Sequence, residues 1–312
     1  MHIHTTLTPA LLTLAILAAG TATVAQAAPV NPQQESNTPA SSPQPPASAP
    51  HRAYHFFGAL PDPAQQADSG ITLGLGILHQ HYVETIAGTT LDSERGSLPV
   101  YRLGYAGQWR HFGFGVSVQY AHGHDYYDGS LESCTQAGCS CAPVTSRTHN
   151  QIVDLTTALD DGFSPVQGLA VIPEVLLGEH YWHRAIDGVG PSDLGSVTEN
   201  YLDLYYAGGL KLQYTSGPVV LGVEGRYGRT FFARMAADPL DGTFNLGHAP
   251  VYSVRAQVTW VALPWLKLHL RDTYGSFSYG ASQLLHLGNG LTAQEPHSRT
   301  QQNLVEVGIT LL

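Results

Sequence analysis

The segment Phe112-Gly113-Phe114-Gly115-Val116-Ser117-Val118-Gln119-Tyr120 alternates large apolar residues with glycine or small polar residues. A strict period of two is typical of a β-strand whose two faces meet different surroundings. The alternation recurs about ten times along the chain. It is clear at 202–214, 219–227, 252–260, 266–271 and 305–311, and weaker at 71–83, 98–109, 149–159 and 168–183. The sequence therefore predicts an all-β fold.

Composition narrows the class of protein. Charged residues make up 12 % of the 312 residues, about half of the roughly 25 % typical of soluble domains. The net charge of −10, with 14 Lys and Arg, argues against nucleic acid as a partner, because nucleic-acid binding needs a basic surface. Beyond residue 30, polar residues interrupt every apolar stretch before a helix could span a bilayer.

The N-terminal region predicts export. An apolar stretch at 11–19 is followed by Ala25-Gln26-Ala27, an A-x-A cleavage site, although the first residues contain no Lys or Arg. We predict a signal peptide at 1–27. Residues 28–52 contain seven prolines and predict a disordered Pro-rich linker, because such a stretch cannot bury enough apolar surface to offset its chain entropy. Residues 53–312 remain for one barrel domain.

The connections between the predicted strands alternate in length. Short turns are expected at 109–111, 160–162, 215–218 and 263–264, and long polar loops at 84–97, 124–147, 184–198, 233–249 and 282–298. Short turns at one end and long loops at the other are characteristic of outer-membrane barrels.

Aromatic residues form two predicted belts. Beside the short turns are Trp109, Phe112, Tyr214, Trp260 and Trp265. Toward the long loops are Tyr82, Tyr120, Tyr181, Tyr201, Tyr227, Tyr252 and Tyr274. Two belts match the two interfaces of a membrane, and lipid requires the sheet to close because it offers no partner to a free strand edge.

With these features the chain resembles the Gram-negative outer-membrane β-barrel proteins. The resemblance covers the export signal, residues 71–312 and the alternating C-terminal strand Val305-x-Val307-x-Ile309-x-Leu311, although Leu312 stands where such chains usually end on an aromatic residue. It implies a closed antiparallel up-and-down transmembrane barrel of about ten strands, with periplasmic turns, extracellular loops and both termini in the periplasm. It also implies outer-membrane lipid, lipopolysaccharide and the barrel-assembly machinery as partners.

The face opposite the large apolar residues predicts the barrel interior. It carries a nearly balanced set of charges: Arg102, Asp154, Glu174, Asp203, Lys211, Glu224, Arg226, Arg255, Lys267, His269, Arg271 and Glu306. Buried charges persist only when they are paired and hydrogen-bonded, and a ten-stranded lumen is only modestly wider than one that side chains fill. We therefore expect an interlocked ionic core. The alternative is a narrow solute path lined by Arg226, Arg255 and Arg271.

Histidines and cysteines offer candidate metal ligands. His79, His81, His122 and His124 share the parity of the lipid-facing residues, which predicts interfacial polar aromatics and leaves a zinc or copper site as the alternative. Cys134, Cys139 and Cys141 lie in the longest predicted loop, where we expect a disulfide from Cys134 to Cys139 or Cys141. No cofactor is expected.

Catalytic constellations are weak in this sequence. Omptin proteases, which are ten-stranded barrels, pair two carboxylates with a His–Asp dyad at the outer rim, whereas here His124-Asp125 and Asp160-Asp161 are expected at opposite ends. A lipid-modifying site would need Ser130 or Ser133 beside His122. We predict a non-enzymatic outer-membrane barrel whose loops contact ligands or envelope components. The alternatives are a small passive channel, a rim-site enzyme and an autotransporter translocator.

Overall fold

The computed structural model describes residue 64 and residues 66–312, apart from 136–137, 189–195, 239–241 and 287–291, and only the backbone of 131–141. The chain divides into the units Met1–Tyr54 and His55–Leu312, and the fold reported below belongs to the second. The predicted signal peptide, the predicted linker and the first residues of the predicted barrel domain lie outside the described residues.

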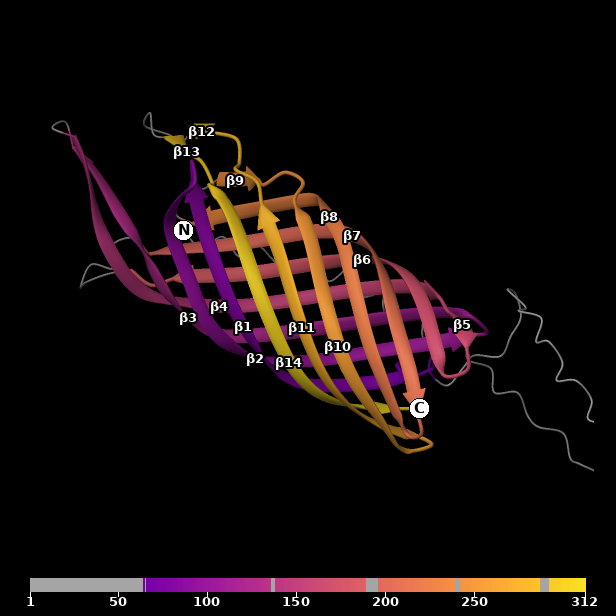
Figure 1. Ribbon diagram of the computed structural model, residues 1–312. Helices are drawn as coiled ribbons and strands as arrows, with labels where there is room; N and C mark the ends of the chain where they lie inside the picture. Colours follow the sequence, from indigo (N-terminus) through magenta and orange to yellow (C-terminus); the bar gives the residue numbers. More distant parts are fainter. Residues whose placement is uncertain (1–63, 65, 136–137, 189–195, 239–241, 287–291) are drawn as a thin grey trace, which may run out of the picture. The chain divides into compact units, whose positions relative to one another are not determined.

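The described chain is built from β-strands (Figure 1). In chain order they are β1 (Gly70–Ile86), β2 (Thr89–Trp109), β3 (Phe112–Thr135), β4 (Gly138–Asp161), β5 (Phe163–Val166), β6 (Leu169–Ile186), β7 (Val197–Ser216), β8 (Val219–Asp238), β9 (Gly242–Asn245), β10 (Pro250–Leu263), β11 (Leu266–Tyr279), β12 (Leu285–His286), β13 (Thr292–Ala293) and β14 (His297–Leu311). Among these residues, no helix is long and apolar enough to cross a membrane.

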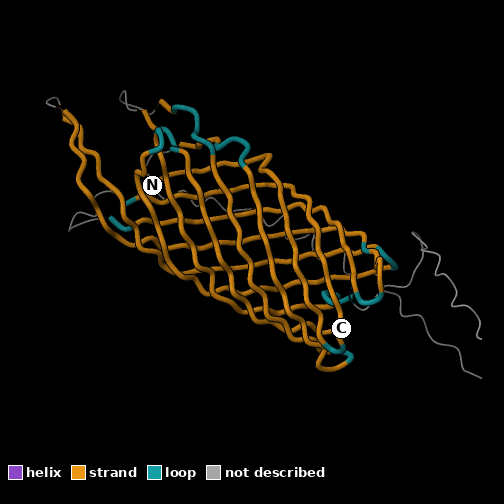
Figure 2. The backbone as a smooth tube through the Cα atoms, viewed as in Figure 1, coloured by secondary structure: helices purple, strands orange, loops and turns teal. Residues whose placement is uncertain are grey.

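Ten long strands close into an antiparallel barrel, as predicted. Each pairs with its neighbours in the chain, and β14 pairs with both β11 and β1, so that Val307 faces Leu270 on one side and Leu75 on the other. Closure gives each of the ten long strands a partner on both sides through the body of the barrel, which a lipid environment requires. Figure 2 shows the continuous wall that results.

Short turns connect the strands at one end. Two residues join β2 to β3, β7 to β8 and β10 to β11, and the positive φ of Arg110 and Gly217 allows such tight reversals. The turn predicted at 160–162 was wrong. Asp160 is still paired with Glu174, and the chain reverses only at Gln167-Gly168, after the short strand β5.

At the opposite end the strands continue into segments that we predicted as loops. Residues 84–97 form a hairpin that reverses at Ala87-Gly88, both with positive φ. Most of 124–147 is a hairpin of β3 and β4, each 24 residues long, which projects beyond the other strands (Figure 1). About ten residues suffice for a strand to cross the bilayer, so these strands rise well above it.

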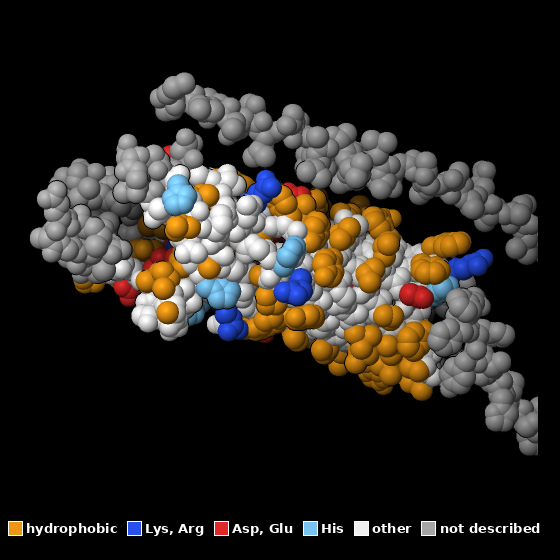
Figure 3. All heavy atoms as spheres, turned by 90° about the horizontal axis from the view of Figure 1, so that it is seen from above, with side chains coloured by type: hydrophobic (Ala, Val, Ile, Leu, Met, Phe, Trp, Pro, Cys, Tyr) orange, Lys and Arg blue, Asp and Glu red, His pale blue; other side chains and the backbone are white. Residues whose placement is uncertain are grey.

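The barrel wall separates two kinds of side chain. Large apolar residues such as Leu75 and Val223 point outward, and they gather on the wall in Figure 3. The predicted belt beside the short turns is exposed on the exterior. The second belt is only partly correct, because Tyr82 and Tyr201 are completely buried in the lumen. Their strand parity, which continues that of the inner face, places them there.

Candidate functional site in the barrel interior

A layer of ion pairs crosses the middle of the lumen. Glu224 of β8 lies 2.7 Å from Arg226, 3.4 Å from Arg255 and 3.9 Å from Lys211. Arg226 also binds both carboxylate oxygens of Glu174 on β6, at 2.6 and 3.1 Å. Charge-assisted bidentate contacts of this kind satisfy buried charges.

Glycines on the inner face make room for these pairs. A Cβ atom on Gly209 would lie 2.5 Å from Glu174 Oε1, and one on Gly74 would lie 2.7 Å from the carboxyl carbon of Glu306. The alternation of large outer residues with glycine is therefore also a packing requirement. The long charged side chains cross the lumen at positions where the neighbouring residue is a glycine, which has no side chain.

A second group of charges is centred on Glu306 of β14. Arg271 Nη1 donates to Glu306 Oε1 at 2.9 Å, whereas the nearest contact of Arg102 with this carboxylate is 3.8 Å. Arg102 also donates to the hydroxyl of Ser117 at 3.3 Å. His269, predicted as a possible cation, contacts the hydroxyls of Thr259 and Thr310.

The residues preceding β1 fill the short-turn end of the lumen. Asp68 accepts hydrogen bonds from Lys211 at 3.0 Å and Gln257 at 2.8 Å, and Lys267 donates to the carbonyl of Gln66 at 2.6 Å. Burial opposes ionisation of Asp68, but Lys211 and other nearby cations hold its pKa well below the ordinary value. Sequence reasoning missed Asp68, because it precedes the first strand and belongs to no alternating pattern.

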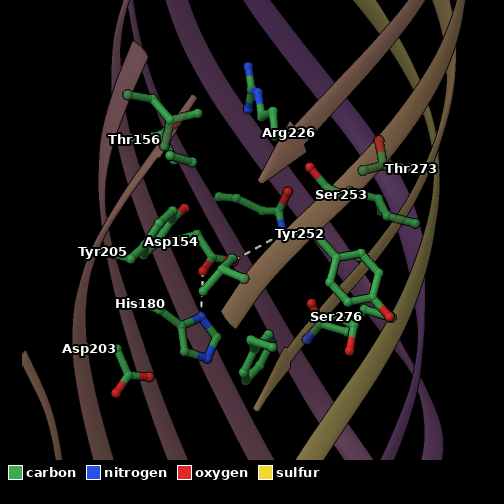
Figure 4. A pocket seen from close by; sticks show the side chains of 18 of the residues that line it. Asp154, Thr156, His180, Asp203, Tyr205, Arg226, Tyr252, Ser253, Thr273 and Ser276 are labelled. Atoms are coloured by element: carbon green, nitrogen blue, oxygen red, sulfur yellow. Dashed lines mark hydrogen bonds and ion pairs between the residues drawn. The ribbon is translucent and has the colours of Figure 1, made fainter. Parts of the chain in front are cut away.

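A buried histidine lies on the long-hairpin side of the ionic layer. His180 Nδ1 donates to Asp154 at 2.5 Å, and the hydroxyl of Tyr279 donates to Asp203. Figure 4 shows Asp154, His180 and Asp203 around one space inside the barrel. Within the described structure, His180 Nε2 has no hydrogen-bond partner.

Two neighbouring cavities occupy the space between these groups, with volumes of about 180 and 120 Å³. Both are lined by Arg102, Ser117, Thr156, Arg226 and Arg255. The larger one extends toward His180 and Tyr279. The smaller one extends to Gln108 and Asp160, next to the short turns.

A layer of aromatic rings closes the lumen beyond the larger cavity. The ring centroids of Tyr82 and Trp182 are 5.3 Å apart, those of Trp182 and Tyr201 5.1 Å, and those of Tyr201 and Tyr279 5.2 Å. All four side chains are fully buried. Phe244 of β9 packs into the same cluster.

A cluster of carboxylates around one arginine lies on the outer side of this layer. Arg184 is 1 % exposed and contacts Glu199 at 2.5 Å, Glu94 at 2.7 Å and Glu84 at 3.4 Å. Its guanidinium also lies 4.5 Å from the ring centre of Tyr82. The sequence predicts Glu84, Glu94 and Arg184 in long polar loops, but they lie on the strands β1, β2 and β6. Continuing the strand parity past the expected loop boundaries would have placed them inside.

Glu295, in the connection between β13 and β14, completes this outer cluster. It accepts a hydrogen bond from the hydroxyl of Tyr201 at 3.1 Å. Burial, reinforced by the nearby charge of Glu199, raises the pKa of Glu295 to about 8. The carboxylate of Glu295 thus binds a proton more tightly than an ordinary glutamate does.

The four candidate metal-binding histidines lie on the exposed exterior. His122 stacks on Tyr120, with ring centroids 5.5 Å apart, and His79 hydrogen-bonds to Ser97. The described residues contain no group of three or more His, Cys, Asp or Glu with metal-binding geometry. The backbone of Cys134 is paired with that of Cys139, but the side chains of Cys134, Cys139 and Cys141 lie outside the described structure.

The residues considered for catalysis are not brought together. His124 is exposed on the exterior, while Asp125 of the same strand is buried. Asp160 lies near the far end of β4, on the order of 30 Å away. His122 and Ser130 are eight positions apart in β3, roughly 26 Å, and the side chain of Ser133 is not described.

Comparisons with known proteins support the architecture. No family model matches the sequence, and neither does any curated protein. Among solved structures, the outer membrane protease OmpT from Escherichia coli aligns with a TM-score of 0.50 at 10 % identity, over 78 % of this chain and 97 % of that chain. The fold is that of an outer-membrane β-barrel. The translocator domain of the autotransporter NalP from Neisseria meningitidis aligns with a TM-score of 0.39 at 8 % identity, over 78 % and 88 % of the two chains.

Proposed function

We propose that the protein is a non-enzymatic, closed barrel of the Gram-negative outer membrane. Its lumen is sealed, and its protruding hairpins contact ligands or other components of the envelope. The observation that carries this proposal is the filling of the lumen by three successive layers: the Glu224 ion pairs, the aromatic rings around Trp182 and the carboxylates around Arg184. A passive channel would need a continuous water-filled path, which the aromatic layer interrupts.

Planar-bilayer recording tests the seal. The refolded mature protein is expected to give no steady single-channel steps. The double variant Trp182→Ala/Tyr201→Ala should give at most brief, unsteady openings, because two of the four stacked rings are removed while the layers around Glu224 and Arg184 remain. Trp260→Ala is a matched control, since this indole is exposed on the barrel exterior. Steady steps from the unsubstituted protein would establish the channel and refute the proposed function.

The orientation follows from the lengths of the connections. We place the short turns and both termini in the periplasm and the long hairpins outside the cell, as the class of barrel implies. An epitope can be inserted at Gly88 or at Gly217, since a Cβ atom at either position meets no other atom within 4 Å. An antibody should detect the tag at Gly88 on intact cells and the tag at Gly217 only after permeabilisation. The reverse pattern would invert the orientation.

Lipopolysaccharide is the envelope component that the exterior fits best. Arginines are exposed on the outer half of the wall, beyond the apolar band: Arg95, Arg147, Arg229 and Arg299. Guanidinium groups bind phosphate in bidentate fashion. Charge-neutral substitution of all four is expected to weaken binding to lipopolysaccharide-containing liposomes at least tenfold, with no effect on folding. Unchanged binding would exclude this partner.

A further inference from the structure

The guanidinium of Arg102 is the least well paired of the charged groups in the middle of the lumen. Arg226 has ion-pair contacts of 2.6 and 2.7 Å and Arg271 one of 2.9 Å, whereas the nearest carboxylate contact of Arg102 is 3.8 Å. Its one described hydrogen bond, to Ser117, is 3.3 Å long. A guanidinium has five N–H donors. Most of the donors of Arg102 are therefore available to a ligand in the neighbouring cavities.

Arg255 is loosely paired in the same way. Its contacts with Glu224 and Thr273 are 3.4 and 3.3 Å. The side chains of Arg102 and Arg255 are each 15 % exposed, although both point into the closed barrel. This exposed surface faces the cavities, because each arginine lines both of them.

Hydroxyl groups surround the same space. Figure 4 shows Thr156, Ser253 and Thr273 lining the larger cavity together with Arg226. Hydroxyl and guanidinium donors converging on one void form the usual environment of a bound oxyanion. The volume of about 180 Å³ is ample for a phosphate or a short carboxylate. A bound oxyanion would accept hydrogen bonds from guanidinium groups whose contacts with Glu306 and Glu224 are long, at 3.8 and 3.4 Å.

The geometry also defines how a ligand reaches this space. The smaller cavity shares five lining residues with the larger one and extends to Gln108 and Asp160, beside the short turns. In the opposite direction the rings of Trp182 and Tyr201 close the lumen. The two cavities therefore form a pocket that is closed on the side of the aromatic rings. Toward the short turns its lining includes Asp68 and Ser69, so a ligand enters past the residues that precede β1.

We propose that this pocket is a binding site for a small oxyanion, a phosphate or a short carboxylate, held by Arg102 and Arg255. The site goes beyond the proposed function, since a sealed barrel can exist with or without it. Under the proposed orientation, the ligand comes from the periplasm.

Isothermal titration of the refolded mature protein in detergent tests the proposal, with sodium phosphate, sodium acetate and sodium chloride at matched ionic strength. Phosphate or acetate is expected to bind saturably at millimolar concentration, at least tenfold more tightly than chloride. Which oxyanion binds identifies the source: inorganic phosphate or a metabolite carboxylate. No saturable binding of either oxyanion, or equally tight binding of chloride, would overturn the site.

Two variants locate the binding. Arg102→Gln removes the guanidinium, and Ser253→Leu fills the larger cavity while leaving both arginines in place. Each is expected to weaken oxyanion binding at least tenfold. Arg95→Gln is the matched control, because it removes the same charge from the same strand as Arg102→Gln, β2, but at an exposed position. If Arg102→Gln fails to fold, Ser253→Leu decides the outcome, and wild-type affinity in that variant would refute the proposed location.

Discussion

Replacing Arg184 by methionine should destabilise the barrel strongly and in a pH-dependent way. Methionine keeps the unbranched apolar stem of the side chain, but it removes the guanidinium that lies over Tyr82 and the positive charge from three buried glutamates at 2.5, 2.7 and 3.4 Å. Breaking a buried ion pair by removing one partner costs about 3–5 kcal/mol, because the remaining charge is left uncompensated. We expect a loss of this size at pH 8, equivalent to roughly 200- to 5,000-fold in the folding equilibrium.

Acidification should reverse most of this loss. Below the ordinary carboxyl pKa of about 4.3, the glutamates can be neutral in the variant, and the cost should fall to about 1–2 kcal/mol, that of unmade hydrogen bonds. Urea unfolding in liposomes, followed by tryptophan fluorescence at pH 8 and pH 4, measures both values. Arg234→Met is the control, because Arg234 is exposed and stacks on Phe232. A loss below about 1 kcal/mol at pH 8, or one independent of pH, would refute the charge argument.

Three further predictions address packing, protonation and the lipid face. Gly209→Ala should lower the free energy of unfolding by about 1–3 kcal/mol, because its Cβ atom would meet Glu174 Oε1 at 2.5 Å, whereas Gly225→Ala, with no atom within 4 Å, should be neutral in the same urea titration. Because burial raises the pKa of Glu295 from 4.5 to about 8, the folded state holds a proton that the unfolded state has lost. Stability should therefore fall as pH rises from about 4.5 to about 8, and Glu295→Gln should flatten that slope; an unchanged slope would contradict the assignment. Leu75→Arg, on the exposed apolar band, should cost about 2–4 kcal/mol in liposomes, and a cost no greater than that of Leu75→Ala would argue against a lipid contact there.

Strand parity predicted most of the inner face because it is a local property. Once Val116 and Val118 are assigned to the exterior, Ser117 and Gln119 must point inward, and the same rule places Arg226 and Arg255 in the lumen. The prediction fails where the strands extend further than the expected loop boundaries. Polar residues such as Glu84, Glu94 and Arg184 are predicted in long polar loops, although they lie on β1, β2 and β6, which continue past the expected loop boundaries.

The sequence by itself determined the architecture: an alternating apolar face, repeated along the chain and divided by turns, can be satisfied in lipid only by a closed barrel. Only the tertiary structure decided which groups meet inside it. Arg184 pairs with Glu94, which lies 90 positions away in the sequence. Asp68, which belongs to no strand, binds Lys211. Such contacts depend on strand stagger and on the path of the connecting segments, which a period of two does not encode.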